Sequence, residues 1–434
     1  MLGFGTKKGA RNGVRAALLT GATVAALSVG GLGAGSAAAA PACNGSNIVG
    51  QGSSLQRVAQ EKVWIPGFQG GICPGGPTVT YNSTGSGGGL KEWNHDGARG
   101  SINTAIHFIG TDDAPTAAQI TNITKVAGGA SLLTIPVAQT SIAFVANPPA
   151  GCEVEAITNK QLEQVFRGTL KTWSALDTAE GTCNSPITRV VRKDASGTTF
   201  QTKNYLARMF GGTLPCLGIS WLEARAINNS TTGEPNTNWP ETCEGTTLST
   251  VEKPAATGGG AVVEKVNATA GSIGYAATPD AKAKNAKLIL AVQNNGQVSA
   301  GEAEFASPIV GEEANCLTTQ YTVPVGARQK AGEPATNVDW SQVFGAHPAA
   351  GGEAYPLCTL TYILAFRGYG SVPGATKFKF VNEVTVRDYV KEYITAAAGQ
   401  AAMESNYYAP LPAAAESSKN VLGSAQFTAG KIKF

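Results

Sequence analysis

The stretch ITRVVRKDASGTTFQTKNYLARMF, residues 187–210, joins a strand directly to a helix. Its first five residues are mainly β-branched, which is typical of a buried strand. Apolar side chains then recur at helical spacing, at Tyr205, Leu206, Met209 and Phe210. Hydroxyl residues and a glycine separate the two patterns, so the free N–H groups of a helix N-terminus open where the strand ends. Such a junction attracts anions, because the positive end of the helix dipole faces outward.

Arg192 is the first charged residue of this junction. Its planar guanidinium can donate two parallel hydrogen bonds, which suits two oxygens of a tetrahedral anion. A helix capped by a hydroxyl residue, beside an arginine at the surface, would give the same sequence. The stretch by itself leaves both interpretations open.

Three other strand-like segments end in the same manner. Small and polar residues follow them, as GQGSSL at 50–55, NSTGSGGGL at 82–90 and GTDDAP at 110–115. The alternation of such segments with helical patterns predicts an α/β fold. Ligands of open α/β sheets bind at the carboxyl ends of the strands, so we expect the four loops to converge on one anion.

Two helices are indicated by capping signals. Thr158–Gln161 has the pattern of a capping box, and Gly168 is placed to end the helix that follows. A second helix is expected to open at Thr385–Asp388, with Val386, Tyr389, Val390, Tyr393 and Ile394 as its apolar stripe.

Two long apolar segments, 132–147 and 355–366, are candidates for extended crossings between two lobes. The chain is also longer than a single hydrophobic core usually supports. If the chain leaves the first lobe at one crossing and returns at the other, the first lobe is discontinuous. We therefore predict lobe I at 43–137 plus 356–434 and lobe II at 138–355.

Residues 1–42 have the layout of a secretory signal peptide. Lys7, Lys8, Arg11 and Arg15 precede a mildly apolar stretch, and small residues lead to an expected cleavage near Ala42. The protein is accordingly expected outside the cytoplasm, in the periplasm or cell envelope, or secreted. Removal of this segment leaves 29 basic and 30 acidic residues, a charge near −1 that does not indicate a nucleic-acid partner.

The eight cysteines suit an oxidising compartment, and none of them shows CxxC spacing. Cys43 directly follows the signal-like segment, which raises the alternative of a lipid-anchored cysteine. We favour four disulfides, because lipidation would leave an odd number of thiols. Sequence does not fix connectivity, and we predict pairing of sequence neighbours, as Cys43–Cys73, Cys152–Cys183, Cys216–Cys243 and Cys316–Cys358.

In these motifs and their order, most of the chain after residue 42 resembles the PstS-type phosphate-binding proteins of ABC phosphate importers. The similarity extends through Ile157–Trp173, Gly271–Tyr275 and Tyr355–Leu364. The resemblance implies a periplasmic-binding-protein-like fold of type 2, in which each of two lobes is a central sheet flanked by helices. It also implies that the ligand lies in the cleft between the lobes and that the partner is an ABC permease.

By position, the resemblance assigns the phosphate ligands. The first loop would supply the Ser54 hydroxyl and the Leu55 N–H, and the remaining donors and acceptors fall on Ser86, Asp113, Arg192, Ser196, Gly197 and Thr198. The acidic partner of the arginine falls on Asp194. Two positions depart from the family pattern, with serine for threonine at 54 and alanine for a common glycine at 195.

Asp113 is the residue that would select phosphate. A carboxylate repels a bound anion unless that anion donates a hydrogen bond to it. Phosphate retains a hydrogen near neutral pH and sulfate does not, so sulfate would leave a buried carboxylate unpaired. The structural alternative is that Asp113 caps a helix that begins near Ala114-Pro115.

The expected function is capture of inorganic phosphate by a monomer and its delivery to an ABC importer, without catalysis, cofactor or metal. The alternatives are a secreted phosphate-ester hydrolase and a surface protein that retains an oxyanion-binding fold. A hydrolase is disfavoured because His95, His107 and His347 are the only histidines, and neither a GxSxG elbow nor a Walker loop is present. His107 is expected to pack inside the fold, and His95 to lie on the helix after the glycine-rich loop or at its exposed end.

Overall fold

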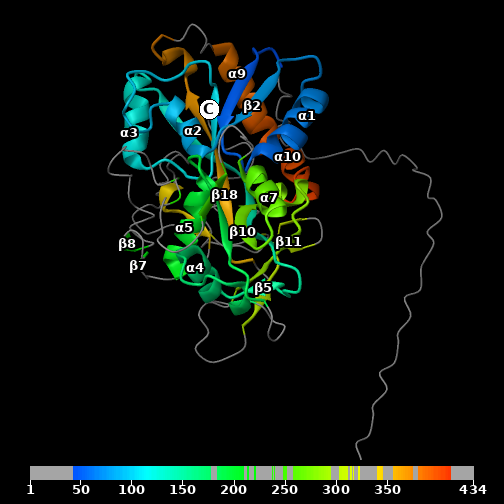
Figure 1. Ribbon diagram of the computed structural model, residues 1–434. Coiled ribbons are helices and arrows are strands. Elements are labelled where there is room, and N and C mark those ends of the chain that lie inside the picture. Colours follow the sequence, from blue (N-terminus) through cyan, green and yellow to red (C-terminus); the bar gives the residue numbers. More distant parts are fainter. Residues whose placement is uncertain are drawn as a thin grey trace, which may run out of the picture. The chain divides into compact units, whose positions relative to one another are not determined.

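The structure, a computed structural model, is shown in Figure 1. It describes residues 43–176, 183–209, 213–214, 219–220, 237, 239, 248–251, 258–294, 303–310, 313–314, 316, 321–322, 340–345, 355–374 and 380–411. The predicted signal peptide, 1–42, lies outside the described residues, all of which belong to the compact unit Pro41–Phe434. Within these ranges, no helix has both the length and the apolar character needed to cross a bilayer.

The main sheet contains nine of the described strands, in the order β2-β1-β3-β18-β4-β10-β6-β9, with β11 also paired to β4. Their bounds are β1 Ile48–Gly52, β2 Val79–Ser83, β3 Phe108–Thr111, β4 Ser131–Asn147, β6 Thr188–Arg192, β9 Leu248–Val251, β10 Ser272–Ala277, β11 Leu288–Ile289 and β18 Cys358–Arg367. β1 is parallel to β2 and β3, and β6 is parallel to β9 and β10. The predicted α/β fold is confirmed.

The direction of the strands brings the four predicted loops toward one another. β18 is antiparallel to both β3 and β4, and β4 is antiparallel to β10. The group β1, β2 and β3 therefore runs opposite to β6. Because the two groups run in opposite directions, the carboxyl ends of one can face those of the other, as a site shared between them requires.

β4 changes partners along its length. Its residues 131–141 pair with β18, and its residues 142–147 pair with β10. The pairing of β4 with β18 shifts register between Thr361 and Tyr362. Both long apolar segments of the sequence are thus single extended strands, as predicted.

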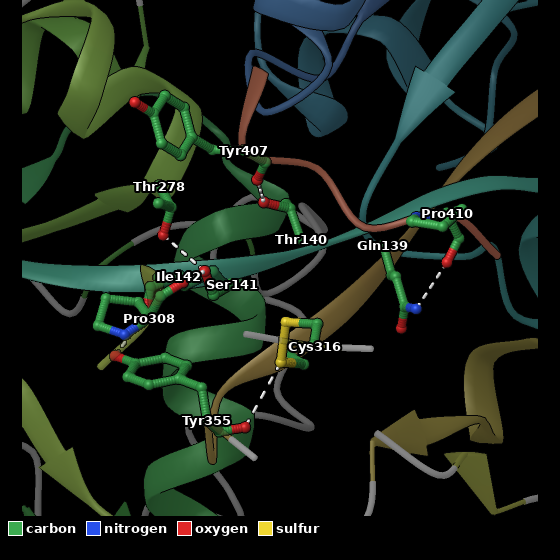
Figure 2. Close-up of a disulfide and its surroundings, with 11 residues drawn as sticks. Gln139, Thr140, Ser141, Ile142, Thr278, Pro308, Cys316, Tyr355, Tyr407 and Pro410 are labelled. Carbon is green, nitrogen blue, oxygen red and sulfur yellow. Dashed lines mark hydrogen bonds between the residues drawn. A yellow bond between two sulfur atoms is a disulfide. The ribbon is translucent and has the colours of Figure 1, made fainter. Parts of the chain in front are cut away.

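The side chains near the middle of β4 change partners at the same place (Figure 2). Gln139 donates from Nε2 to the carbonyl of Pro410 at 2.7 Å, and Thr140 bonds to the carbonyl of Tyr407. The next residue, Ser141, instead bonds to Thr278 at 2.6 Å. Consecutive residues of β4 thus contact opposite parts of the chain.

The shorter strands form small sheets away from the main one. β5 Ala156–Ile157, β12 Ala291–Gln293 and β13 Phe305–Ala306 form one of them. The two-stranded pairs are β7 Thr213–Leu214 with β8 Ile219–Ser220, β14 Ile309–Val310 with β15 Glu313–Ala314, and β16 Tyr321–Thr322 with β17 Phe344–Gly345.

Helices begin directly after several strands of the main sheet. Their bounds are α1 Ile65–Gly67, α2 Ser86–Glu92, α3 Ala117–Val126, α4 Asn159–Arg167, α5 Gly197–Met209, α7 Gly259–Ala268, α8 Thr278–Ala283, α9 Phe380–Tyr389 and α10 Ala397–Ala401. α5 and α7 both pack against β10 (Figure 1). The predicted apolar face of α5 is confirmed, because Tyr205, Leu206 and Met209 are buried, while Phe210 lies outside the described residues.

One of the two predicted helix starts is confirmed and one is wrong. Thr158 and Gln161 form the capping box of α4, and Gly168 ends that helix with a left-handed φ of 87°. α9, however, begins at Phe380, well before Thr385. The Thr385 hydroxyl does not cap the helix, because it donates to the Ser46 carbonyl at 2.7 Å.

Aromatic side chains fill the interior on both sides of the sheet. Trp93 packs on Phe366 with ring centroids 4.5 Å apart, and Phe166 contacts Phe144 at 5.6 Å and Tyr275 at 5.9 Å. Offset and edge-to-face pairs of this kind add to the free energy gained by burial. Tyr389 and Tyr393 face this core, as predicted.

Three of the four predicted disulfides are present, joining Cys43 to Cys73, Cys152 to Cys183 and Cys316 to Cys358. The fourth predicted pair, Cys216–Cys243, lies outside the described residues. Because its sulfur is bonded to Cys73, Cys43 has no thiol to carry a lipid.

Candidate anion-binding site

Arg192 ends β6 and is almost fully enclosed, with 1% of its surface exposed. Its Nε donates to Asp194 Oδ1 at 2.5 Å, and its Nη2 donates to Asp194 Oδ2. This two-point contact fixes the plane of the guanidinium. The interpretation of Arg192 as a surface residue is therefore wrong.

The other end of the guanidinium reaches the first loop. Arg192 Nη1 donates to Ser54 Oγ at 2.9 Å, although the two residues are far apart in sequence. Gly258, just before α7, lies against the same contact, because a Cβ there would be 2.1 Å from Ser54 Oγ. Its φ of 60° is left-handed as well, so both the space and the backbone favour glycine.

Asp112 holds the loops after β1, β2 and β3 together. Ser53 Oγ donates to both carboxylate oxygens, at 2.6 and 2.7 Å. Thr361 in β18 donates to Oδ1 at 2.7 Å, and Ser86 contacts Oδ2 at 3.3 Å. Burial raises the pKa of Asp112 to about 6, although these hydrogen bonds and the charge of Arg192 oppose the rise.

The N-termini of α2 and α5 meet beside this carboxylate. A Cβ on Gly197, the first residue of α5, would lie 2.4 Å from Ser86 Oγ and 2.8 Å from Asp112 Cβ. Ser196 Oγ accepts a hydrogen bond from the Thr199 N–H, as an N-cap residue does. Gln201 of α5 also donates to the Asp112 carbonyl at 2.7 Å.

Asp113 is buried next to Asp112 but has different surroundings. Thr111 Oγ1 accepts from the Asp113 N–H at 3.1 Å and donates to its carbonyl at 2.6 Å. Burial and, to a smaller extent, the charge of Asp112 raise the pKa of the Asp113 carboxyl to about 7, although Lys203 opposes the rise. Burial also lowers the pKa of Lys203 to about 7, against the effect of Asp113.

The structural alternative for Asp113 is wrong. The helix that follows, α3, begins at Ala117, and its N-cap is Thr116, which forms a capping box with Gln119. Asp113 therefore does not cap α3, and the charges that act on its buried carboxyl are those of Asp112 and Lys203.

Four of the predicted ligands are in direct contact as two pairs, Ser54 with Arg192 and Ser86 with Gly197, and Asp194 holds the arginine. Ser196 and Thr198 lie at the start of α5, where both are buried. The Leu55 N–H donates to Ser53 Oγ at 3.1 Å, so it has an internal partner in this structure.

Sequence reasoning missed several residues of the site, namely Ser53, Asp112, Gln201, Lys203, Gly258 and Thr361. Thr361 lies far along the chain and reaches the site only through the pairing of β18 with β3. A lysine among polar residues of a helix usually indicates a surface position, yet Lys203 is fully buried. Ser53 and Asp112 are sequence neighbours of the predicted ligands Ser54 and Asp113, so their position in the same loops is the sequence feature that indicates them.

Two of the three histidines, His95 and His107, lie within the described residues, and His347 lies outside them. His107 Nδ1 accepts from the Val49 N–H at 3.1 Å, which fits the predicted packing role. The prediction that His95 lies on the helix after the glycine-rich loop or at its exposed end is wrong, since α2 ends at Glu92 and His95, which follows it in a turn, is buried. Asn122 of α3 donates to the His95 carbonyl at 3.0 Å. Among the described residues, no three or more histidine, cysteine, aspartate or glutamate side chains are arranged to hold a metal ion.

Comparison with known proteins places the chain in a family. Residues 37–385 match the family model described as the PBP superfamily domain. A curated relative from an unknown prokaryotic organism, named phosphate-binding protein, is 28% identical over 327 residues, which cover 71% of this chain and 77% of the relative.

Solved structures share the fold. A high affinity periplasmic phosphate-binding protein bound with phosphate has a TM-score of 0.58 at 20% identity, covering 89% of this chain and 96% of its own. The phosphate-binding protein from Stenotrophomonas maltophilia has a TM-score of 0.55 at 18% identity, with coverage of 84% and 90%. The chain therefore belongs to the PBP superfamily, has its two-lobed type 2 fold, and is similar within it to phosphate-binding proteins of the PstS type.

Proposed function

We propose that this protein binds one inorganic phosphate between its lobes, without chemical turnover, and delivers it to an ABC importer outside the cytoplasm. The observation that carries the proposal is Arg192, an almost fully buried guanidinium fixed by Asp194 and aimed at Ser54. A buried cation at the meeting point of four loops suits an anion with several oxygens. The names of the relatives agree with phosphate as that anion.

The ligands proposed are Ser54, the Leu55 N–H, Ser86, Asp113, Arg192, Ser196, Gly197 and Thr198. Hydroxyls and N–H groups at the starts of α2 and α5 would donate to phosphate oxygens, as helix N-termini commonly do. Binding would require the Leu55 N–H to exchange its bond with Ser53 for one with the ligand.

Of the two neighbouring carboxylates, Asp113 is the one we assign to the phosphate hydrogen. Asp112 already accepts hydrogen bonds from Ser53, Ser86 and Thr361, so its oxygens are occupied by the protein. Asp113 is also buried, but its carboxyl is influenced by two neighbouring charges. The charge of Asp112 raises its pKa, and the charge of Lys203 lowers it. An incoming phosphate that donates a hydrogen bond would stabilise the ionised form of Asp113, and sulfate could not.

We further propose that β4 and β18 connect the lobes, with lobe I at 43–137 plus 356–434 and lobe II at 138–355. The change of partners between Thr140 and Ser141 supports a boundary in this part of β4, although it lies a few residues after position 137 (Figure 2). Thr140 bonds to Tyr407 of the proposed lobe I, and Ser141 bonds to Thr278 of the proposed lobe II. Closure about this point would enclose the ligand, and the closed form of the monomer would be what the permease recognises.

Titration calorimetry on ligand-stripped protein tests the function. We expect one phosphate per chain and far weaker binding of sulfate at about pH 8, where Asp113 is mainly ionised. Asp113→Asn should reduce this selectivity, because an amide can donate to sulfate. Equal affinity of the wild type for the two anions would refute the role of Asp113, and no binding of either would refute the proposed function.

A further inference from the structure

An ion pair outside the phosphate ligands joins the proposed lobes. Arg57 Nη2 donates to Asp280 Oδ1 at 2.7 Å. Arg57 belongs to the segment assigned to lobe I, and Asp280 belongs to α8 in the segment assigned to lobe II. The pair is enclosed, since the exposed fractions of the two side chains are 14% and 2%.

Arg57 is tied to the first ligand loop. Its N–H donates to the Ser54 carbonyl at 3.1 Å, which closes the turn that presents the Ser54 hydroxyl. Tyr408 fixes the same loop from the C-terminal segment, because its hydroxyl donates to the Leu55 carbonyl at 2.5 Å. Moving Arg57 therefore moves the turn that contacts Arg192.

Asp280 is held on the opposite side, between α8 and the start of α7. A Cβ on Gly259, the first residue of α7, would lie 2.5 Å from Asp280 Oδ2. The carboxylate thus lies beside the start of α7, whose positive dipole end attracts a negative charge. Burial raises the pKa of Asp280 to about 6, and the charge and hydrogen bond of Arg57 oppose this rise. The preceding residue, Gly258, lies against both Ser54 and Arg192. Asp280 therefore contacts the residue that follows the one packed on the Arg192–Ser54 hydrogen bond.

α8 makes one more charged contact across the same boundary. Lys282 Nζ lies 5.2 Å from the ring centroid of Tyr407, a cation–π geometry. Tyr407 is next to Tyr408, which bonds to the first loop. α8 therefore faces the surface formed by the first loop and the segment at 407–408.

We propose that Arg57 and Asp280 are positioning residues for phosphate, forming an ion pair that aligns the Ser54 loop with Arg192 as the lobes close. This role rests on the proposed phosphate binding and adds two residues that do not contact the ligand. In the open form each charge is solvated, and closure transfers both from water into the interface. Two matched charges then compensate each other, whereas a single one left by mutation makes closure unfavourable.

The structure orders the expected effects of three variants. Arg57→Gln leaves Asp280 buried without its partner, so phosphate affinity should fall by about tenfold or more. Asp280→Asn should have a smaller effect, because Arg57 keeps more contact with solvent. The double variant should bind no more weakly than Arg57→Gln, since the two residues act through one interaction.

Glu61→Gln is the matched control. Glu61 is the other acidic partner of Arg57, at 3.4 Å, but it is 42% exposed and lies in the same segment as Arg57. Losing an exposed pair of this kind should change phosphate affinity by less than about twofold. The unfolding temperature of each ligand-free variant distinguishes a loss of positioning, which leaves it near the wild-type value, from a loss of folding.

Calorimetry with inorganic phosphate decides the outcome. Weakened binding in Arg57→Gln, with a wild-type unfolding temperature and normal binding in Glu61→Gln, supports the proposal. Wild-type affinity in Arg57→Gln, additive losses in the double variant, or losses explained by a lower unfolding temperature would overturn it while phosphate binding stands. Absence of phosphate binding in the wild type would instead remove the proposed function and this role with it.

Discussion

Replacing Arg192 with alanine removes a charged hydrogen-bond donor that links the end of β6 to the Ser54 loop. A guanidinium has five N–H donors. In this structure Nε and Nη2 each donate one to Asp194, and Nη1 donates one to Ser54. One N–H on each Nη therefore stays available, which allows two charge-assisted hydrogen bonds to an anion.

The magnitude follows from that count. Charge-assisted hydrogen bonds contribute about 1.5–3 kcal/mol each, so two of them amount to roughly 3–6 kcal/mol. Water that replaces the guanidinium recovers part of this binding free energy. The carboxylate of Asp194, left without its partner, repels the phosphate anion and so reduces it further. We expect Arg192→Ala to weaken phosphate binding by at least ~2 kcal/mol, about 30-fold in Kd.

Isothermal titration of ligand-stripped protein measures this difference. Arg189→Ala provides the control, because Arg189 is also a buried arginine of β6 and donates to the Phe166 carbonyl at 2.6 Å, away from the loops. Arg189→Ala should lower the unfolding temperature but leave the affinity of the folded protein unchanged. An Arg192→Ala protein that folds and binds phosphate as tightly as the wild type would show that the anion site lies elsewhere.

Two other predictions concern pH and packing. Because the pKa of Asp113 is raised to about 7, its carboxyl is mainly protonated at pH 6 and can donate to sulfate, whereas at pH 8 it is mainly ionised and repels it. Sulfate affinity measured by calorimetry should therefore fall as pH rises from about 6 to 8, and a flat profile would contradict the assignment of Asp113. Gly197→Ala places a Cβ 2.4 Å from Ser86 Oγ, so it should separate α5 from Asp112 and reduce both phosphate affinity and the unfolding temperature. An alanine variant with wild-type affinity would mean that α5 does not have to approach Ser86 this closely for binding.

Local features of the fold were predictable because they depend on neighbouring residues. The strand at 188–192, the capping box of α4 and the long strands β4 and β18 each follow from a pattern within a few residues. The start of α9 was missed because the partner of the Thr385 hydroxyl is Ser46, at the opposite end of the chain.

The residues of the candidate site also fall into two groups, those that local sequence identifies and those that depend on tertiary packing. Loops at strand ends identify Ser54, Ser86 and Arg192, since the direction of each strand determines where its loop opens. The burial of Lys203 and the contact of Thr361 with Asp112 depend on tertiary packing, and no spacing in the sequence encodes them. Arg57 and Asp280 likewise become partners only after the chain has folded.

The register shift in β18 has a mechanical consequence. Thr361, at that irregularity, donates to Asp112 and accepts from Gln56 Nε2 at 2.7 Å, so the irregular part of β18 contacts both the loop after β3 and the segment after β1. Protonation of the Asp112 carboxylate would weaken the hydrogen bond that it accepts from Thr361, at the position where the pairing of β18 with β4 is irregular. If β4 and β18 connect the lobes as proposed, the protonation state of Asp112 and the bending of this connection are coupled through Thr361.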